Sequence, residues 1–375
     1  MPDTFDLAVV GGGVLGLAHA LAAARSGRRV VVIDREGRAN GASVRMPGIV
    51  GVTGQPAGAA WRRAKRSRDV WADVAAQASV RIEHEGLAIV ARRPEAASAL
   101  EAFMTTEMGE DCTLYTAEDG HALFPQFKGA MSAVFWSPHE LRVEAKSAMP
   151  KIAAWLAEAH DVAFRWETAV TAIEGTRIAT SRGLIEAGAA VVCPGDDFRS
   201  LFGETLARAG LVRAKSHMLR VRPEEGFELP GAVATDLSLI RLPGFAELPE
   251  ASALRARLEA EQPEHLAHGV ALIATQSADD TLVLGASRQV DATPDPFQTQ
   301  AIDELILEEF AAVFGKRPKA VLSRWTGTYA FNPERPVVVE APAPNVRVVV
   351  AASGAGATGA FAIGEETIAD LFGKG

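Results

Sequence analysis

The sequence predicts an α/β fold with two sheets, one parallel and assembled from separated segments, the other mostly antiparallel. An apolar strand, a glycine turn, an alanine-rich helix and a second apolar strand follow one another over residues 6–34, and another continuous apolar run occupies residues 189–195. Such runs are typical of buried parallel strands. Between residues 211 and 292 apolar and polar positions alternate, which predicts antiparallel strands covered on one face.

The glycines after the first strand have the spacing of a dinucleotide site. Gly11, Gly13 and Gly16 form G-x-G-x-x-G, in which the first allows a tight turn, the second lets backbone approach a pyrophosphate, and the third lets helix and strand pack closely. The following helix offers unpaired N–H groups to phosphates. Asp34 ends the second strand, where a carboxylate accepts from ribose hydroxyls, so FAD or NAD is favoured over NADP.

The remaining elements can be placed by their apolar periodicity and by Gly and Pro. Helices are expected at Val14–Ser26, Ala59–Gln77, Glu144–His160, Pro296–Phe314 and Phe361–Phe372. Strands are expected at Gly86–Ala91, Val212–Val221, Val233–Leu242, Gly269–Gln276, Leu282–Ala286, Val321–Tyr329 and Val346–Ala352, and a glycine loop at Ser353–Gly359.

Composition excludes several classes of protein. The chain has 375 residues, enough for two domains, and its net charge of −9 argues against general nucleic-acid binding. Its two cysteines are too few for a disulfide framework or a cysteine metal site, so no metal is expected. No signal peptide or membrane-spanning segment is recognised, which leads us to expect a soluble, cytoplasmic protein that binds a small molecule. The oligomeric state stays open.

The order of these motifs resembles the glycine oxidase / sarcosine oxidase / D-amino-acid oxidase superfamily of FAD-dependent amine oxidoreductases. The matching pieces are Gly11–Gly16 with Asp34, the loop at 41–43, the strand at 191–195, and residues 325–327 with 353–356. The resemblance implies a discontinuous Rossmann-like FAD-binding domain (residues 1–85, 141–210 and 322–375) and a substrate-binding domain (86–140 and 211–321). It also implies FAD, which we expect to be noncovalent because neither cysteine fits the covalent attachment site of sarcosine oxidases.

Within that superfamily, several loops are similar to the branch associated with 2-aminoethylphosphonate catabolism. They are residues 41–45, 54–58, 294–297 and 358–366. The branch implies oxidation of 2-aminoethylphosphonate or its N-methyl derivative to phosphonoacetaldehyde. Met46, His217 and Arg288 depart from the branch pattern at positions that could line the pocket.

The candidate cofactor residues share a position on the loops that the superfamily places around FAD. They are Gly11, Gly13, Gly16, Asp34, Arg35, Ala42, Ser43, Arg45, Val170, Pro194, Gly195, Gly354, Ala355, Gly356, Ala357 and Thr358. The last loop leads into a helix, whose N-terminus suits the negative charge that develops on a reduced flavin.

The candidate substrate residues are cations that match a phosphonate and aromatic residues near the expected flavin face. They are Arg45, His217, Arg241, Arg288, Trp325 and Tyr329, with Arg45, His217 and Tyr329 as the catalytic candidates. For each of them a structural or surface role is the alternative interpretation.

Three other functions stay open. The first is an oxidase or dehydrogenase of glycine, sarcosine or a small D-amino acid, the second a nicotinamide dehydrogenase, and the third a non-catalytic flavoprotein subunit. We expect an oxidase rather than a dehydrogenase, but the sequence leaves both oxygen and a quinone as possible electron acceptors.

Overall fold

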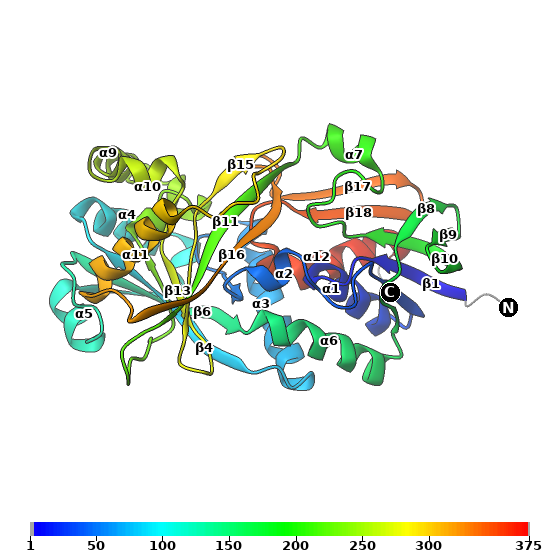
Figure 1. Ribbon diagram of the computed structural model, residues 1–375, viewed down its shortest axis with the longest axis horizontal. Helices are drawn as coiled ribbons and strands as arrows, with labels where there is room; N and C mark the ends of the chain where they lie inside the picture. The colour runs from blue at the N-terminus through cyan, green and yellow to red at the C-terminus, as the bar shows by residue number, and fades with distance from the viewer. Residues whose placement is uncertain (1–3, 374–375) are drawn as a thin grey trace.

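A computed structural model describes residues 4–373 and contains two sheets, at the right and left of Figure 1. The first sheet has the order β17 (Val337–Ala343), β18 (Val346–Ala351), β10 (Gly183–Val192), β1 (Thr4–Val10), β2 (Val30–Ile33) and β7 (Ala163–Arg165), and β8 (Val170–Glu174) and β9 (Arg177–Thr180) extend it beside β10. The strands from β18 to β7 are parallel, whereas β17 is antiparallel to β18. Three segments distant in sequence therefore form one parallel sheet.

The second sheet is mostly antiparallel. Its order is β15 (Gln289–Asp291), β11 (Val212–Arg222), β14 (Leu282–Gly285), β13 (Ile273–Gln276), β12 (Ala232–Thr235), β4 (Ile82–Ala91), β6 (Ala133–Val143) and β3 (Ile49–Val50), with β16 (Ala320–Phe331) on β11 and β5 (Thr113–Thr116) on β6. Only the pair of β12 and β4 is parallel among these strands of the described chain. Because β16 pairs along β11, the domain boundary expected at residue 322 falls inside a strand of this sheet.

Helices surround both sheets (Figure 1). They are α1 (Val14–Arg25), α2 (Ala42–Arg45), α3 (Ala59–Gln77), α4 (Pro94–Met104), α5 (Ala117–Leu123), α6 (Ala145–His160), α7 (Gly203–Arg208), α8 (Pro243–Ala246), α9 (Ala251–Glu261), α10 (Pro263–Ala267), α11 (Gln300–Phe314) and α12 (Gly356–Phe372), with single 3-10 turns at Glu107–Gly109 and Asp236–Ser238. No helix within residues 4–373 is both long enough and apolar enough to cross a membrane.

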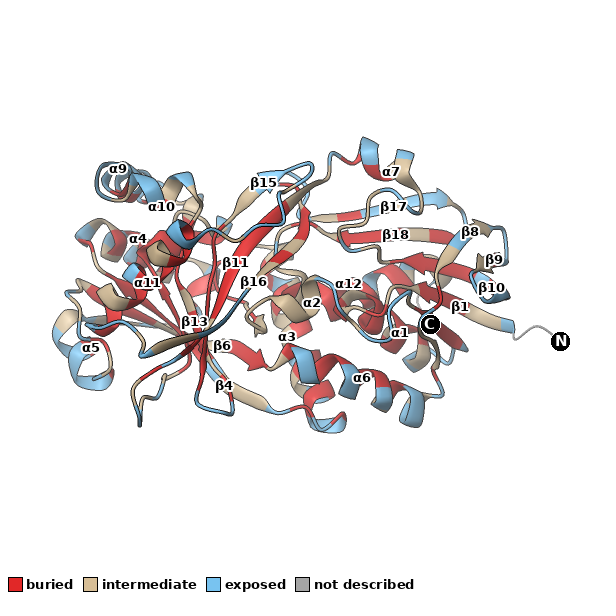
Figure 2. Cartoon of the chain, in the orientation of Figure 1, coloured by how far each residue is buried: buried red, intermediate tan, exposed pale blue. Residues whose placement is uncertain are grey.

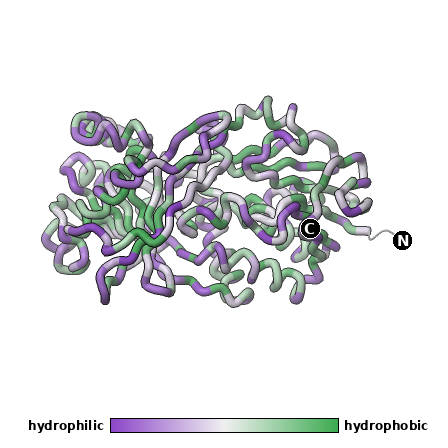
Figure 3. The backbone as a smooth tube through the Cα atoms, viewed as in Figure 1, coloured by the Kyte–Doolittle hydropathy of each residue, from purple (hydrophilic) through white to green (hydrophobic). Residues whose placement is uncertain are grey.

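The alternation of side chains along β1 explains how the first sheet is buried. Leu7 and Val9 pack on the face that carries α1 and α12, whereas Ala8 packs on the opposite face. α1 and α12 touch each other closely, since a Cβ on Gly364 would lie 2.9 Å from the Ala18 backbone. Figure 2 shows the consequence, because burial in this sheet is concentrated in the central strands β18, β10, β1 and β2, whereas β17, β8 and β9 are largely intermediate or exposed. Figure 3 shows the hydropathy along the same chain.

Three expectations about local structure are wrong. The second sheet has apolar clusters on both faces, because α4 and α9 cover one face and α11 the other. The strand expected at Val233–Leu242 ends at Thr235, where the chain turns into the 3-10 turn and α8. The glycine loop expected at Ser353–Gly359 is helical from Gly356, and only Gly354 in it has the left-handed φ, +80°, that favours glycine.

Candidate active site

A cavity of about 510 Å³ lies at the carboxyl ends of β1, β2 and β10, where ligands bind in open α/β sheets. Most of the predicted cofactor residues line it: Gly11, Gly13, Gly16, Asp34, Arg35, Ala42, Ser43, Arg45, Val170, Pro194, Gly195 and Gly356. The sequence therefore brings these distant loops together around one space.

A second cavity of about 290 Å³ continues from the first toward the second sheet. The two share five lining residues: Val14, Ala42, Ser43, Ala351 and Gly356. The remaining predicted cofactor residues, Gly354, Ala355, Ala357 and Thr358, line this second cavity together with Arg241, Arg288 and Tyr329. The joint space thus has an end built on the first sheet and an end built partly on the second.

The three glycines of the motif have different surroundings. A Cβ on Gly16 would lie 1.8 Å from the Gly11 carbonyl oxygen, and one on Gly11, where φ is +110°, would lie 2.4 Å from the Cys193 carbonyl oxygen. These two positions are closed by backbone. Gly13 instead faces the cavity, and a Cβ there would meet only the Ser43 hydroxyl, at 3.1 Å. A side chain at Gly13 would enter the space that a pyrophosphate needs.

The N-terminus of α1 is open to a phosphate. Gly13 is its N-cap, no side chain of the first turn is acidic, and only the Val14 N–H has a side-chain acceptor, the Ser43 hydroxyl at 3.0 Å. At the other end of this cavity the Asp34 carboxylate accepts from the backbone N–H of Gly12 at 2.6 Å and of Glu36 at 2.8 Å. These bonds fix the carboxylate while each oxygen keeps a further lone pair for a hydroxyl.

The N-terminus of α12 lies between the two cavities. The helix begins at Gly356 without a side-chain cap and without an acidic residue in its first turn, so its free N–H groups and dipole favour negative charge there. The Thr358 hydroxyl accepts from the Gly51 N–H at 3.0 Å and ties this turn to the loop before α3. The glycine turn and the N-terminus of α1 fit the pyrophosphate of FAD. The fixed Asp34 carboxylate fits its ribose hydroxyls, and the N-terminus of α12 fits the negative charge of a reduced flavin ring.

Two arginines and a tyrosine form one wall of the second cavity. Arg241 donates through Nη1 to the carbonyl oxygens of Gly269 and Ala286, at 2.9 and 3.0 Å. Arg288 donates through Nε to the Tyr329 hydroxyl at 3.3 Å, with its guanidinium 4.9 Å from the centre of the Phe331 ring. We call Arg241, Arg288 and Tyr329 the cationic wall.

The positive charges of Arg241 and Arg288 repel each other. Burial, and to a smaller degree the charge of Arg288, lowers the pKa of Arg241 to about 10, so it stays protonated at neutral pH. Burial alone would raise the pKa of Tyr329, but the charges of Arg288 and Arg241 outweigh it and lower that pKa. Two adjacent cations in a partly enclosed cavity stabilise an anion placed between them.

Not every predicted substrate residue reaches this wall. His217 is fully buried and its Nδ1 lies 3.2 Å from the Asp303 carboxylate of α11, because side chains alternate along β11 and its neighbour Ser216 takes the face toward Tyr329. Trp325 packs against Met218 and donates to the Arg45 carbonyl oxygen at 2.8 Å, without lining either cavity.

Two predicted arginines line the first cavity, at the ends of β1, β2 and β10, which we call the nucleotide cavity. Arg45 lines that cavity, with its Nε donating to the Asn40 carbonyl oxygen at 3.0 Å. Arg35 lies at its rim, pairs with Asp197 at 2.7 Å and leaves most of its side chain exposed. Neither of them lines the second cavity.

Sequence reasoning missed Glu140 and Thr53, which also line the second cavity. Glu140 is 1% exposed, and its Oε1 accepts from the Thr53 N–H at 2.6 Å. One signal was present, namely an acidic residue inside a strand segment that ends in Leu141, Arg142 and Val143 and is otherwise poor in acids.

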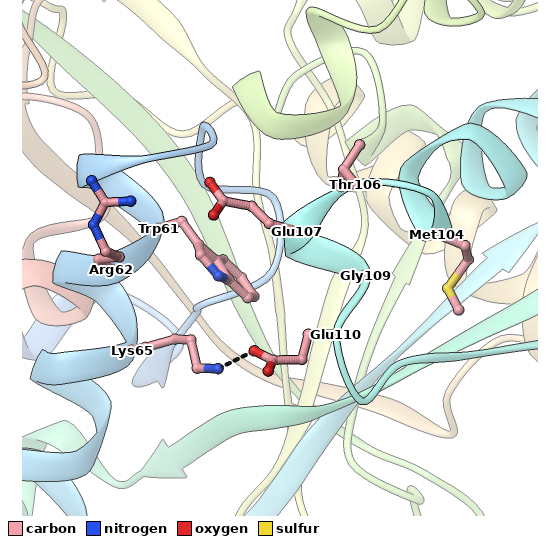
Figure 4. Close-up of a pocket in the computed structure, with 8 residues that line it drawn as sticks. All are labelled: Trp61, Arg62, Lys65, Met104, Thr106, Glu107, Gly109 and Glu110. Carbon is pink, nitrogen blue, oxygen red and sulfur yellow. Dashed lines mark hydrogen bonds and ion pairs between the residues drawn. The ribbon is translucent and has the colours of Figure 1, made fainter.

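A third pocket is an open depression of about 670 Å³ on the surface, shown in Figure 4. Its residues come from α3, from the last residue of α4 and from the segment that follows it, and Lys65 and Glu110 pair across it at 2.5 Å. It shares no lining residue with the two joined cavities. The residues predicted for the cofactor, together with Arg241, Arg288 and Tyr329, line the joined cavities and not this depression.

The fold is shared with solved oxidoreductase structures. Glycine oxidase from Bacillus cereus ATCC 14579 superposes with a TM-score of 0.78 at 17% identity, covering 99% of this chain and 96% of that one. L-proline dehydrogenase from P. horikoshii gives 0.79 at 18%, covering 99% and 94%. FAD-bound L-α-glycerophosphate oxidase from Mycoplasma pneumoniae gives 0.75 at 15%, covering 98% and 95%.

Comparison of the sequence with curated proteins found no match. The sequence does match a family description, DAO, FAD dependent oxidoreductase, over residues 6–371. That match spans both sheets and all the loops that line the joined cavities. The chain therefore belongs to the DAO family of FAD-dependent oxidoreductases, and FAD is its cofactor.

Proposed function

We propose that this enzyme oxidises a small amine that carries a phosphonate, namely 2-aminoethylphosphonate or its N-methyl derivative, to phosphonoacetaldehyde. The observation that carries the proposal is the cationic wall, in which Arg241 and Arg288 lie beside each other next to the N-terminus of α12. A phosphonate resembles a phosphate in having three acceptor oxygens and up to two negative charges. Two guanidinium groups match that charge and geometry better than one.

The reaction needs little from the protein beyond orientation and charge. When bound, FAD would supply the acceptor for a hydride from the carbon next to the amine. The substrate is left as an imine, which water converts to the aldehyde and ammonia, or methylamine from the N-methyl compound. Arg241 and Arg288 hold the phosphonate, and the N-terminus of α12 stabilises negative charge at the cofactor. Oxygen then takes the electrons from the reduced cofactor in an oxidase.

The second candidate is an oxidase or dehydrogenase of glycine, sarcosine or a small D-amino acid. Structural likeness to a glycine oxidase and an L-proline dehydrogenase favours it, although at 17–18% identity this likeness concerns the fold. A carboxylate substrate would also bind the cationic wall. The two candidates differ in the anion they prefer and not in the chemistry at the amine.

The test is reduction of the bound flavin by a panel of amines without oxygen. The holoenzyme is mixed without oxygen with one amine at a time, and the loss of flavin absorbance is recorded. The amines are N-methyl-2-aminoethylphosphonate, 2-aminoethylphosphonate, glycine, sarcosine and D-alanine. We expect bleaching by an aminophosphonate in one turnover and hydrogen peroxide once oxygen is admitted. Bleaching by none of the amines would favour a non-catalytic flavoprotein, and bleaching by NADH alone a nicotinamide dehydrogenase.

A further inference from the structure

The wall of the second cavity contains a carboxyl group that the account above leaves unused. Glu140 lies on β6 and lines the cavity with Thr53, on the loop after β3. Its Oε1 is held by the Thr53 N–H at 2.6 Å, while its Oε2 is buried without a hydrogen-bond partner. The side chain is 1% exposed. A buried carboxyl oxygen without a partner is costly, so it calls for a specific role.

The surroundings of Glu140 supply no cation that would pair with it. Thr53 and Ser137 offer hydroxyl groups, Cys112 a thiol, and His139 on the same strand the closest titratable ring. On α3, Lys65 pairs with Glu110 and Arg68 donates to the His139 carbonyl oxygen. Arg241 and Arg288, which line the same cavity, are held by carbonyl oxygens and by Tyr329. The free Oε2 therefore has no internal positive partner among the described residues.

We propose that Glu140 is a catalytic residue that binds the ammonium group of the substrate and accepts its proton. This proposal rests on the proposed function only in requiring an amine as substrate. An N–H bond of the ammonium breaks, its electron pair stays on nitrogen, and the proton joins a lone pair of Glu140 Oε2. The products are a neutral amine and a neutral carboxylic acid. The nitrogen lone pair so freed is what permits a hydride to leave the adjacent carbon.

The electrostatics of the site agree with this direction of transfer. Burial raises the pKa of Glu140, an effect larger than the opposite one of its hydrogen bonds from Thr53. A raised pKa makes the carboxylate a stronger base. The cavity then has a base at Glu140 and an anion site at the cationic wall, which suits a substrate with an amine at one end and an acid at the other.

The first experiment measures the rate of anaerobic flavin reduction against pH. Glu140→Gln keeps the acceptor for the Thr53 N–H but cannot take a proton. We expect a loss of about 100-fold at pH 7, the scale of general base catalysis. The rate should recover as the pH rises toward the pKa of the free amine, because the substrate then binds already deprotonated. In wild type the rate should instead rise with pH as Glu140 loses its proton.

The matched control is Glu309→Gln. Glu309 is also 1% exposed and also has one buried oxygen without a partner, but it lies on α11 and lines neither cavity. Its variant should keep the wild-type pH profile. A wild-type profile in Glu140→Gln would overturn the proposal, and so would an equal loss at every pH in that variant.

The second experiment measures binding without turnover. Dithionite-reduced holoenzyme cannot oxidise a substrate, so calorimetry can compare 2-aminoethylphosphonate with ethylphosphonate, which lacks the amine, and sarcosine with acetate. In at least one of these pairs, wild type and Glu309→Gln should bind the member with the amine about 10-fold or more tightly than the member without it. This ratio of affinities is expected of a charge-assisted hydrogen bond. Glu140→Gln should lose this preference while still binding the amine-free anion.

These outcomes separate the two proposals. If the wild-type flavin is reduced only by amino acids, the phosphonate assignment fails while the assignment of Glu140 stands on the sarcosine pair. If no amine reduces it, the proposed function fails and the catalytic role of Glu140 fails with it, whatever the binding preference. An unchanged preference in Glu140→Gln, or loss of both ligands of a pair, would overturn that role.

Discussion

The two ends of the joined cavity recognise their ligands by different means. At the nucleotide end the contacts are mainly backbone and small residues, namely Gly13, the N-terminus of α1 and the fixed Asp34 carboxylate. At the substrate end the contacts that we propose are long polar side chains, namely the cationic wall and Glu140, contributed by strands and loops of the second sheet. The nucleotide end is thus specified by local spacing, whereas the substrate end can change by substitution of single side chains while the fold is kept.

The largest effect should come from closing the nucleotide end. Gly13→Val places a side chain in the space for the pyrophosphate, so the variant should purify without flavin while keeping its fold. Flavin absorbance per chain and thermal unfolding check the two parts of this prediction. The control is Gly37→Val, because Gly37 is exposed, lines neither cavity, and a Cβ there would make only an ordinary contact, 3.8 Å from the Glu167 side chain. A flavin-replete Gly13→Val variant would show that this glycine does not face the cofactor.

At the substrate end, replacing an arginine of the cationic wall should weaken only the binding of the substrate's anionic group. Arg288→Met and Arg241→Met should each lower kcat/KM for N-methyl-2-aminoethylphosphonate by about 10- to 100-fold, since a hydrogen bond to a charged group contributes about 1.5–3 kcal/mol. A neutral amine of similar size should be affected much less. Steady-state kinetics with both amines provide the measurement. Arg317→Met is the control, because Arg317 is half exposed, pairs with Glu304 and Glu308 of α11 and lines neither cavity. Equal losses with both amines would mean that the arginines act on folding and not on recognition.

This contrast also explains what the sequence predicts well. The glycine spacing, Asp34 and the loop at 41–43 lie close together in the chain, and their arrangement follows from one strand–turn–helix unit. Continuous apolar runs predict the parallel strands of the first sheet, and alternating apolar and polar positions predict the antiparallel strands of the second. Local chemistry is therefore enough to predict the fold class and the loops that line one cavity.

The substrate end depends on facts that a single sequence does not contain. His217 and Tyr329 are equally good candidates from residue type alone, but the register of β11 against β16 turns His217 toward α11 and leaves Tyr329 facing the cavity. Glu140 was missed because its burial depends on the packing of the Thr53 loop against β6. Strand alternation is readable in a sequence, whereas the identity of the face that meets the cavity is a tertiary property.

A smaller effect is expected at the adenosine side of the nucleotide end. Asp34→Ala should weaken FAD binding by about 1.5–3 kcal/mol for each charged hydrogen bond lost, without changing kcat of the reconstituted enzyme. FAD titration of the apoprotein followed by turnover of the refilled enzyme tests both statements. Glu36→Ala, at the exposed rim of the same cavity, serves as the control. Unchanged FAD affinity would mean that the carboxylate serves only the Gly12 and Glu36 backbone.

The smallest effect concerns His19 in α1 and the pH dependence of the free energy of unfolding. Burial lowers the pKa of His19 from 6.5 to about 4, against a smaller opposite effect of its bond to the Leu15 carbonyl. Between these values the unfolded chain binds a proton that the folded chain excludes, so stability falls as the pH drops through this window. From pH 7 to pH 5 the loss should reach about 2 kcal/mol. Burial also lowers the pKa of His84 to about 4, with a smaller effect of the Arg142 charge, so His84 adds a loss of its own in every protein tested. Urea unfolding with FAD in fixed excess should therefore show a loss in His19→Gln that is about 2 kcal/mol smaller than in wild type and in His121→Gln, and equal losses in all three proteins would contradict it.

The most direct test of the central claim compares two substrates on the wild-type enzyme. N-methyl-2-aminoethylphosphonate and sarcosine share the N-methylamine and differ in the length of the chain and in the anion that the cationic wall would hold. Anaerobic flavin reduction, measured over a range of concentrations of each, gives the ratio of their second-order rate constants. Recognition of a phosphonate by Arg241 and Arg288 predicts a ratio well above one in favour of the aminophosphonate. A ratio in favour of sarcosine would contradict it and would assign the cationic wall to a carboxylate.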